Sequence, residues 1–119
     1  MSIRSLWFVL LVATACAKSN SAAQGDVAKG EEIFAQRCVL CHGSTGHGDG
    51  PASISLDPKP RQFADHAWQA KVTDDDIEKV IKLGGAAVGK SAAMPPNPDL
   101  DDPQVVAGLR SVVRGFGKN

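Results

Sequence analysis

Cys38-Val39-Leu40-Cys41-His42 is the stretch that decides the fold of this chain of 119 residues. Two cysteines three positions apart lie on the same face of one helical turn, and a histidine follows the second directly. This spacing lets each thiol add across one vinyl group of a porphyrin while the histidine reaches the metal. The pentapeptide therefore predicts attachment of a c-type haem, with Cys38 and Cys41 as the thioether positions and His42 as an iron ligand.

The two cysteines have three other interpretations, each with less support. A zinc site needs a second pair of ligands, but Cys16 lies in an apolar leader, and His47 and His66 stand at no zinc-like spacing. A thioredoxin-like pair should follow a strand, whereas residues 31–36 have the pattern of a helix. A structural disulfide stays open as the simplest alternative, although it gives no role to His42.

The amino end has the pattern of an export signal. Arg4 precedes an apolar run at residues 6–12, and small residues follow. The run is too short to span a bilayer, so a retained anchor helix is the weaker alternative. We expect residues 1–15 to be a signal peptide, which directs the chain to the periplasm or another extracytoplasmic space, where c-type haem is attached.

The sequence leaves open both the position and the type of the signal-peptide cleavage. Ala13-Thr14-Ala15-Cys16 resembles the lipobox of bacterial lipoproteins, in which the cysteine becomes a lipidated first residue, although alanine replaces the usual leucine at the first position. Ordinary cleavage after Ala15, or after residues 21–23, stays open. If Cys16 is lipidated, residues 16–25 form a flexible spacer to a membrane tether, and residues 26–119 form the haem domain.

Composition limits the classes of function. The chain has 13 basic and 13 acidic residues, and removal of residues 1–15 takes away only one charge, that of Arg4. The remainder carries one net negative charge, so nothing indicates nucleic-acid binding. With 43% hydrophobic residues and no tyrosine, a single small domain has few bulky side chains for its core, and a covalently held porphyrin would supply the missing apolar surface.

Stretches rich in glycine and proline separate three helical segments, which predicts an all-α domain with three main helices. The first covers about residues 26–41 and the second begins at an N-cap, Thr73, and stops at Gly84. The third begins with Asp101 as its cap and Gln104 completing a capping box, and extends to about residue 115. No strand pattern is present, and the aspartates at the two helix starts are expected to cap the helices rather than to perform chemistry.

A long segment without helical periodicity, residues 43–71, separates the first two helices. Three glycines on alternate positions, Gly46, Gly48 and Gly50, predict a tight loop, because they release the backbone from ordinary steric limits. A loop of this length usually packs over a ligand or a functional site, and we expect it to cover the edge of the haem.

Met94 is the second candidate iron ligand. Pro95 and Pro96 prevent a helix from continuing and hold Met94 on an extended segment, which suits presentation of its thioether to a metal. With His42 it would form the His/Met pair that raises the potential of a haem. The alternative is a core methionine beneath a loop.

From about Asp26 to Phe116 the chain resembles the class I cytochromes c, small monohaem electron carriers. The order of the parts matches: a first helix leading into CxxCH, a loop, a middle helix, a methionine segment and a closing helix. The resemblance implies a small cytochrome c fold, with long loops wrapped around one covalently bound haem c. It also implies that the closing helix crosses the first one, where Phe34 would meet Leu109 and Val113 close to Gly30.

Short motifs in the long loop resemble a bacterial subgroup of this family. They are Gly48-Asp49-Gly50-Pro51 and Lys59-Pro60-Arg61, together with Trp68. Arg61 and Trp68 are candidate hydrogen-bond donors to buried haem propionates, and a surface arginine with a packing tryptophan is the alternative. His47 and His66 are competing sixth ligands with no motif support.

The expected function is one-electron transfer between redox partner proteins by a monomeric carrier, not an enzyme. Iron held by both His42 and Met94 has no open position for a substrate. Two alternatives stay open. One is a gas-binding or sensing haem domain in which Met94 is labile, and the other is a haem subunit docked in a larger oxidoreductase.

Overall fold

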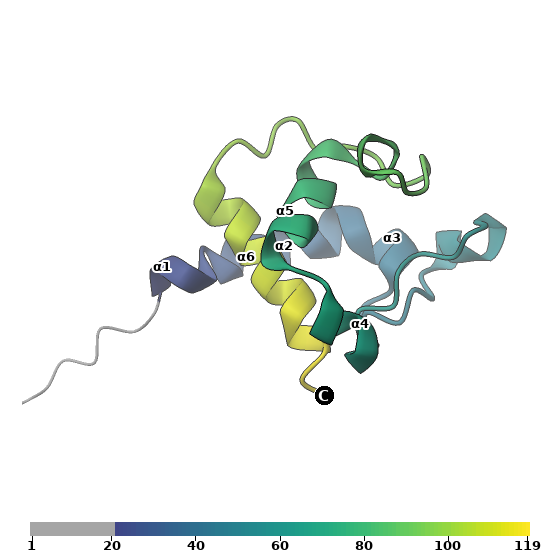
Figure 1. The fold of residues 1–119 in the computed structure, drawn as a ribbon, viewed down its shortest axis with the longest axis horizontal. Coiled ribbons are helices and arrows are strands. Elements are labelled where there is room, and N and C mark those ends of the chain that lie inside the picture. Colours follow the sequence, from purple (N-terminus) through teal and green to yellow (C-terminus); the bar gives the residue numbers. More distant parts are fainter. Residues whose placement is uncertain (1–20) are drawn as a thin grey trace, which may run out of the picture.

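The computed structural model describes residues 21–119, in which all regular structure is helical (Figure 1). The expected signal peptide, Cys16 and the first part of the expected spacer lie outside these residues. The elements in chain order are α1 (Ser21–Gln24), α2 (Val27–Ile33), the π-helical turn η1 (Phe34–Cys38), α3 (Val39–His42), the 3₁₀ helix η2 (Pro51–Ser55), α4 (His66–Lys71), α5 (Asp74–Leu83), the 3₁₀ helix η3 (Ala86–Val88) and α6 (Pro103–Phe116). The expected all-α fold is confirmed.

The first predicted helix is a continuous run of α2, η1 and α3. Asp26 caps its start by accepting a hydrogen bond from the Lys29 amide at 2.9 Å, and the run ends at Gly43, whose φ is +77°. The π turn was not predicted: the Val39 amide donates to the carbonyl of Phe34, five residues back. A π turn takes more residues than an α turn, so it changes the direction in which the following side chains point.

Helices α2 and α6 cross, as the resemblance implied, and a second glycine, Gly108, meets Gly30 at the crossing (Figure 1). A Cβ atom on Gly30 would lie 2.5 Å from the carbonyl carbon of Gly108, so the two backbones touch. Beside the crossing lie Phe34, Leu109 and Val113, all at most 6% exposed. The contact expected from the family is therefore present in this chain.

The second helix begins as predicted and the third begins one residue later. Thr73 and Asp76 form a complete capping box at the start of α5. At α6, however, the cap is Asp102 rather than Asp101, because Pro103 occupies the first helical position, where its missing N–H costs nothing. Gln104 consequently donates its backbone amide to Asp102 instead of completing a capping box.

Two segments that were expected to lack helix contain short helices. Residues 43–71 include η2 and α4, the latter capped by Asp65, whose carboxylate accepts from the amides of Ala67 and Trp68. Residues 21–24, within the expected flexible spacer, form α1, which precedes α2 (Figure 1) and contacts α6. Ser111 donates to the carbonyl of Gln24 at 2.7 Å, and this contact with α6 supports a short helix that composition did not predict.

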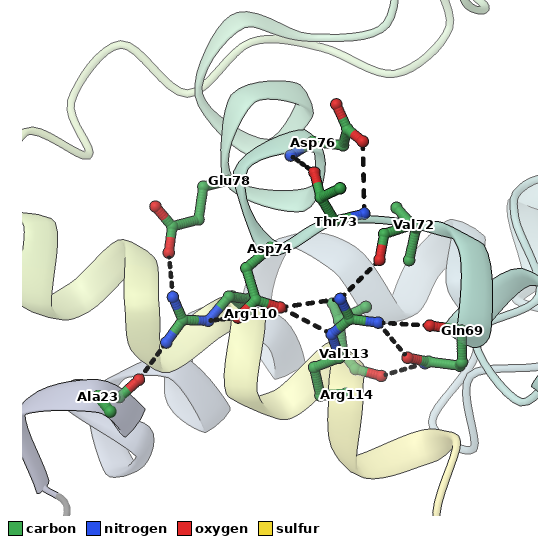
Figure 2. Close-up of polar contacts among 10 residues, drawn as sticks. All are labelled: Ala23, Gln69, Val72, Thr73, Asp74, Asp76, Glu78, Arg110, Val113 and Arg114. Carbon is green, nitrogen blue, oxygen red and sulfur yellow. Dashed lines mark hydrogen bonds and ion pairs between the residues drawn. The ribbon is translucent and has the colours of Figure 1, made fainter.

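Two arginines of α6 join it to the neighbouring segments (Figure 2). Arg110 bonds Glu78 of α5 at 2.6 Å and the carbonyl of Ala23 in α1. Arg114 donates to the carbonyls of Gln69 and Val72 and pairs with Asp74. The side chain of Gln69 donates to the carbonyls of Phe63 and Val113, so the C-terminal half of α6 is bonded to the segment that precedes α5.

Within residues 21–119, no helix has the length and apolar character needed to cross a bilayer.

Candidate haem site

One apolar cavity contains three of the predicted site residues. Cys38, His42 and Met94 all contribute to its walls, although Met94 is more than fifty residues from the other two. The remaining walls are mainly core side chains from the first helix, the long loop, α5 and α6. They are Ile33, Phe34, Phe63, Ile81, Asn97, Leu100, Leu109 and Val113.

His42 is held in one orientation and one tautomer. Its side chain is buried, and Nδ1 lies 3.1 Å from the carbonyl oxygen of Arg61. A carbonyl can only accept, so Nδ1 carries the proton and Nε2 keeps its lone pair. Burial also lowers the pKa of His42, which favours the neutral ring. This is the state in which histidine ligates a metal, with the second nitrogen held by a backbone carbonyl.

The side chain of Phe63 supports this histidine, and the sequence analysis missed it. Its ring is stacked on the His42 ring, with centroids 4.4 Å apart and planes 17° apart. Phe63 also contacts the rings of Phe34 and Phe116, which extend the aromatic cluster toward α6. The available signal was weak: Phe63 is the one bulky apolar residue between positions 57 and 66.

Both cysteines of the motif are free thiols and half-buried. Burial raises the pKa of the Cys38 thiol to about 11, so this thiol is uncharged at neutral pH. An uncharged Cys38 thiol in an apolar wall is poorly suited to metal ligation as a thiolate or to redox exchange, because both need the charged form. The disulfide alternative therefore has no support from this structure.

The glycine-rich loop is tight, as its glycine spacing predicted, and it closes onto the end of the motif, which was not predicted. Gly48 donates its amide to the carbonyl of His42 at 2.8 Å, and Gly50 donates to that of Cys41 at 3.1 Å. A Cβ on Gly48 would meet the carbonyl oxygen of Pro60 at 2.5 Å, and φ there is +70°. Only glycine fits this position, and the loop satisfies the last carbonyls of the helix that carries the motif.

Met94 lies at the end of a turn rather than on a fully extended segment. Its amide bonds the carbonyl of Ser91, and its carbonyl accepts from the Gly85 amide at 2.9 Å. Gly84, with φ +78°, leaves room for the backbone of Met94 and the two prolines. The half-buried side chain lines the cavity together with His42, so a chain turn anchored on the end of α5 brings this thioether to the site.

Arg61 and Trp68 lie near the cavity but their side chains do not line it. The guanidinium of Arg61 lies 5.5 Å from the Trp68 ring centroid and 3.8 Å from the Asp65 carboxylate, while the Trp68 ring packs on Phe63. His66 is exposed at the start of α4 and lies outside the cavity walls.

The other competing histidine is also remote from the cavity walls. His47 is exposed, and its Nδ1 lies 2.9 Å from the hydroxyl of Thr45.

These residues fit a covalently bound haem. The cavity has mainly apolar walls and is lined by the Cys38 thiol, by a histidine with a free Nε2 lone pair and by a methionine thioether, and the second free thiol, Cys41, follows Cys38 three positions later. Within residues 21–119, no group of three or more histidine, cysteine or acidic side chains could hold a metal ion by itself. A haem supplies the one chemistry that this donor set lacks, a metal that changes its charge by one electron.

Comparisons with known proteins support this assignment. The family model for cytochrome C oxidase, cbb3-type, subunit III matches residues 25–107. Among solved structures, the KustC0563 c-type cytochrome is 34% identical with a TM-score of 0.57, and the match covers 73% of this chain and 95% of that one. Among curated proteins, no sequence match was found. The chain belongs to the cytochrome c domain family described by this model, and it is an electron-transfer protein with one covalently bound haem c.

Proposed function

We propose that the protein is a one-electron carrier in which Cys38 and Cys41 hold the haem, and His42 and Met94 are the two axial ligands of its iron. The observation that carries this proposal is the shared cavity. A histidine whose Nδ1 donates to a backbone carbonyl leaves Nε2 for the metal, and the thioether of Met94 lines the same apolar space.

Two protein ligands leave the metal no position for a substrate, which favours transfer of electrons over catalysis. His42 keeps its orientation through the Arg61 carbonyl and the Phe63 ring, so little rearrangement accompanies a change in charge at the metal. A soft, neutral thioether favours the reduced state of iron. The expected carrier therefore has a relatively high midpoint potential.

An absorption spectrum of protein matured in a periplasm tests the ligand set. We expect sharp α and β bands after reduction, a weak long-wavelength sulfur-to-iron band in the oxidised form, and no response of the reduced form to CO. A high-spin spectrum or ready CO binding would favour a gas-binding or sensing domain with a labile Met94. Protein that acquires no haem would contradict the whole assignment.

Arg61 and Trp68 are proposed as donors to the haem propionates. Their positions support this role, because the Arg61 carbonyl bonds His42 and the Trp68 ring packs on Phe63, which lines the cavity. Loss of a charged donor should lower the midpoint potential, since a nearby positive charge disfavours the ferric state. Arg61→Gln should therefore have a lower potential than the wild type, and an equal potential would assign Arg61 to the surface.

We propose that residues 1–15 export the chain and that Cys16 anchors it to a membrane by lipid. The support is the lipobox-like sequence before Cys16. Cys16→Ser should shift the haem protein from the membrane fraction to the soluble periplasmic fraction, while Ser19→Ala should leave the fractionation unchanged. Membrane association that survives Cys16→Ser would exclude the lipid tether.

A docked subunit is the second candidate, and the matching family model favours it, because its description names a subunit of an oxidase. Gentle solubilisation followed by size separation distinguishes the two. Haem from this chain at the size of a monomer would support a free carrier, whereas co-migration with other haem proteins would support a subunit.

A further inference from the structure

Arg37, the residue directly before Cys38, reaches across to the segment that follows Met94. Its guanidinium bonds both carboxylate oxygens of Asp99, at 2.9 and 2.7 Å, and also the side-chain oxygen of Asn97 at 3.2 Å. We call this three-residue contact the Arg37 clamp. It joins positions that are 60 and 62 residues apart in the chain.

Asn97 connects the clamp to α5. Its side-chain nitrogen donates to the carbonyl of Ile81 at 2.8 Å, and its backbone amide donates to that of Lys82 at 3.0 Å. The side-chain amide of Asn97 therefore bonds two helical segments, the first helix through Arg37 and α5 through Ile81. Asn97 also lines the haem cavity together with Met94.

The segment around Met94 is thus held on both sides of this residue. On its N-terminal side, the Gly85 amide holds the Met94 carbonyl. On its C-terminal side, the Arg37 clamp holds Asn97 and Asp99. No helix or strand covers residues 89–102, so the segment keeps its place through these bonds, through the bonds of Asn97 to α5 and through the buried side chain of Leu100.

We propose that the Arg37 clamp positions Met94 toward the haem iron and sets how readily this ligand leaves. The inference rests on the proposed His42/Met94 ligation. Arg37 and Asp99 are positioning residues, because they act through the backbone of the segment and do not line the cavity that holds His42 and Met94. Breaking the clamp lets the segment move away while the thioether bonds and His42 stay in place.

The solvent exposure of the clamp's side chains sets how much its loss should weaken Met94 ligation. The side chains of Arg37 and Asp99 are 40% and 58% exposed, so the ion pair by itself contributes modestly. A bidentate geometry and the added bond to Asn97 increase the contribution. We expect loss of the clamp to raise the population of the Met94-dissociated state on the order of fivefold.

The test uses the haem-loaded protein with Arg37→Gln and, from the other side, Asp99→Asn. Both variants should bind CO in the ferrous state on the order of fivefold more tightly than the wild type. As the pH or the temperature is raised, both should also lose the sulfur-to-iron band of the ferric form earlier than the wild type does. Asp99→Asn lies far from the haem-attachment motif in sequence, so it covers the case in which Arg37→Gln impairs haem attachment.

Glu32→Gln is the matched control. It removes the exposed ion pair with Lys29 on α2, which is 2.9 Å long and does not involve the Met94 segment, so CO binding and the sulfur-to-iron band should stay as in the wild type. Exchange of the two residues, Arg37→Asp combined with Asp99→Arg, should restore part of the wild-type behaviour.

The outcomes separate this inference from the proposed function. If the wild type shows the sulfur-to-iron band, and both single variants retain it with unchanged CO affinity, the clamp has no positioning role. If the wild type itself lacks the band and binds CO freely, the proposed Met94 ligation fails, and the clamp proposal fails with it.

Discussion

The ring of Phe63 is stacked on the ring of His42, with centroids 4.4 Å apart, while the carbonyl of Arg61 accepts a hydrogen bond from the same histidine. Residues 61–63 therefore fix both the ring orientation and the tautomer of His42, the proposed iron ligand. The segment is itself held by the glycine-rich loop, since the amide of Phe63 donates to the carbonyl of Gly46 at 2.6 Å.

Phe63→Ala should destabilise the domain and disturb His42. Truncation of a buried phenylalanine lowers the free energy of unfolding by about 3–5 kcal/mol. Denaturant unfolding of the haem-loaded protein measures this loss. Ile54→Ala is the control, because Ile54 is 84% exposed, and it should change stability by less than about 0.5 kcal/mol. Equal stability of the two variants would show that the Phe63 contact contributes nothing.

Met94→Ala should lower the midpoint potential and allow the ferrous protein to bind CO, because it removes the neutral thioether and opens the sixth position. Potentiometric titration and a CO difference spectrum measure the two effects. His66→Ala is the control and should match the wild type, since His66 lies outside the cavity walls. A Met94→Ala variant with the wild-type potential and spectrum would remove Met94 from the ligand set.

Replacing both Cys38 and Cys41 by alanine should leave haem that acidified organic solvent extracts, because no thioether can form. Extraction followed by measurement of haem in each phase gives the answer directly. Haem that stays with the protein in the double variant would refute attachment through these two thiols.

Gly30→Ala should be strongly destabilising, and Gly115→Ala should not. An added Cβ at Gly30 meets the backbone of Gly108, which forces α2 and α6 apart and lowers the free energy of unfolding by about 1–3 kcal/mol or more. No atom lies within 4 Å of a Cβ added at Gly115 in α6, so alanine there should stabilise the helix by up to about 1 kcal/mol. Thermal unfolding of both variants tests the difference, and two equal shifts would contradict the close crossing.

The Asp99 carboxyl should contribute to stability at neutral pH and lose that contribution in acid. The hydrogen bond from Arg37 lowers the pKa of Asp99 below its ordinary value of 3.8. A lowered folded-state pKa stabilises the protein above the ordinary value, and this stabilisation disappears as the pH falls through the lowered one.

The melting temperature should therefore be higher for the wild type than for Asp99→Asn at pH 7, and the gap should close as the pH falls below 3.8 and through the lowered pKa of Asp99. Asp101→Asn is the control, because Asp101 forms no ion pair within residues 21–119. A gap between wild type and Asp99→Asn that persists unchanged into acid would show that the carboxylate charge is not responsible.

Much of the local structure follows from short stretches of sequence. The capping box of Thr73 and Asp76 and the turn at Gly43 depend on residues within a few positions of one another. Such signals also have limits. Asp101 and Asp102 are equally good caps in sequence, and Pro103 decides between them by accepting only the first position of the helix.

The helices of residues 43–71 and the order of residues 21–24 were not predicted, because their causes lie elsewhere in the chain. Helix α1 bonds α6 through Arg110 and Ser111, and Gln69 in α4 bonds the carbonyl of Val113. A helix of four to six residues is too short to be stable alone, and it forms here because distant side chains satisfy its backbone groups.

The sequence by itself determined the haem-attachment motif and the order of the three main helices, because each depends on residue type at fixed spacing, while the helix crossing near Gly30 was expected only from the family resemblance. Only the tertiary structure decided what surrounds the site. His42 meets Arg61 across 19 positions, and Arg37 meets Asp99 across 62. Such pairs depend on the path of the whole chain, since a hydrogen bond forms wherever folding brings donor and acceptor together, and no local pattern records that meeting.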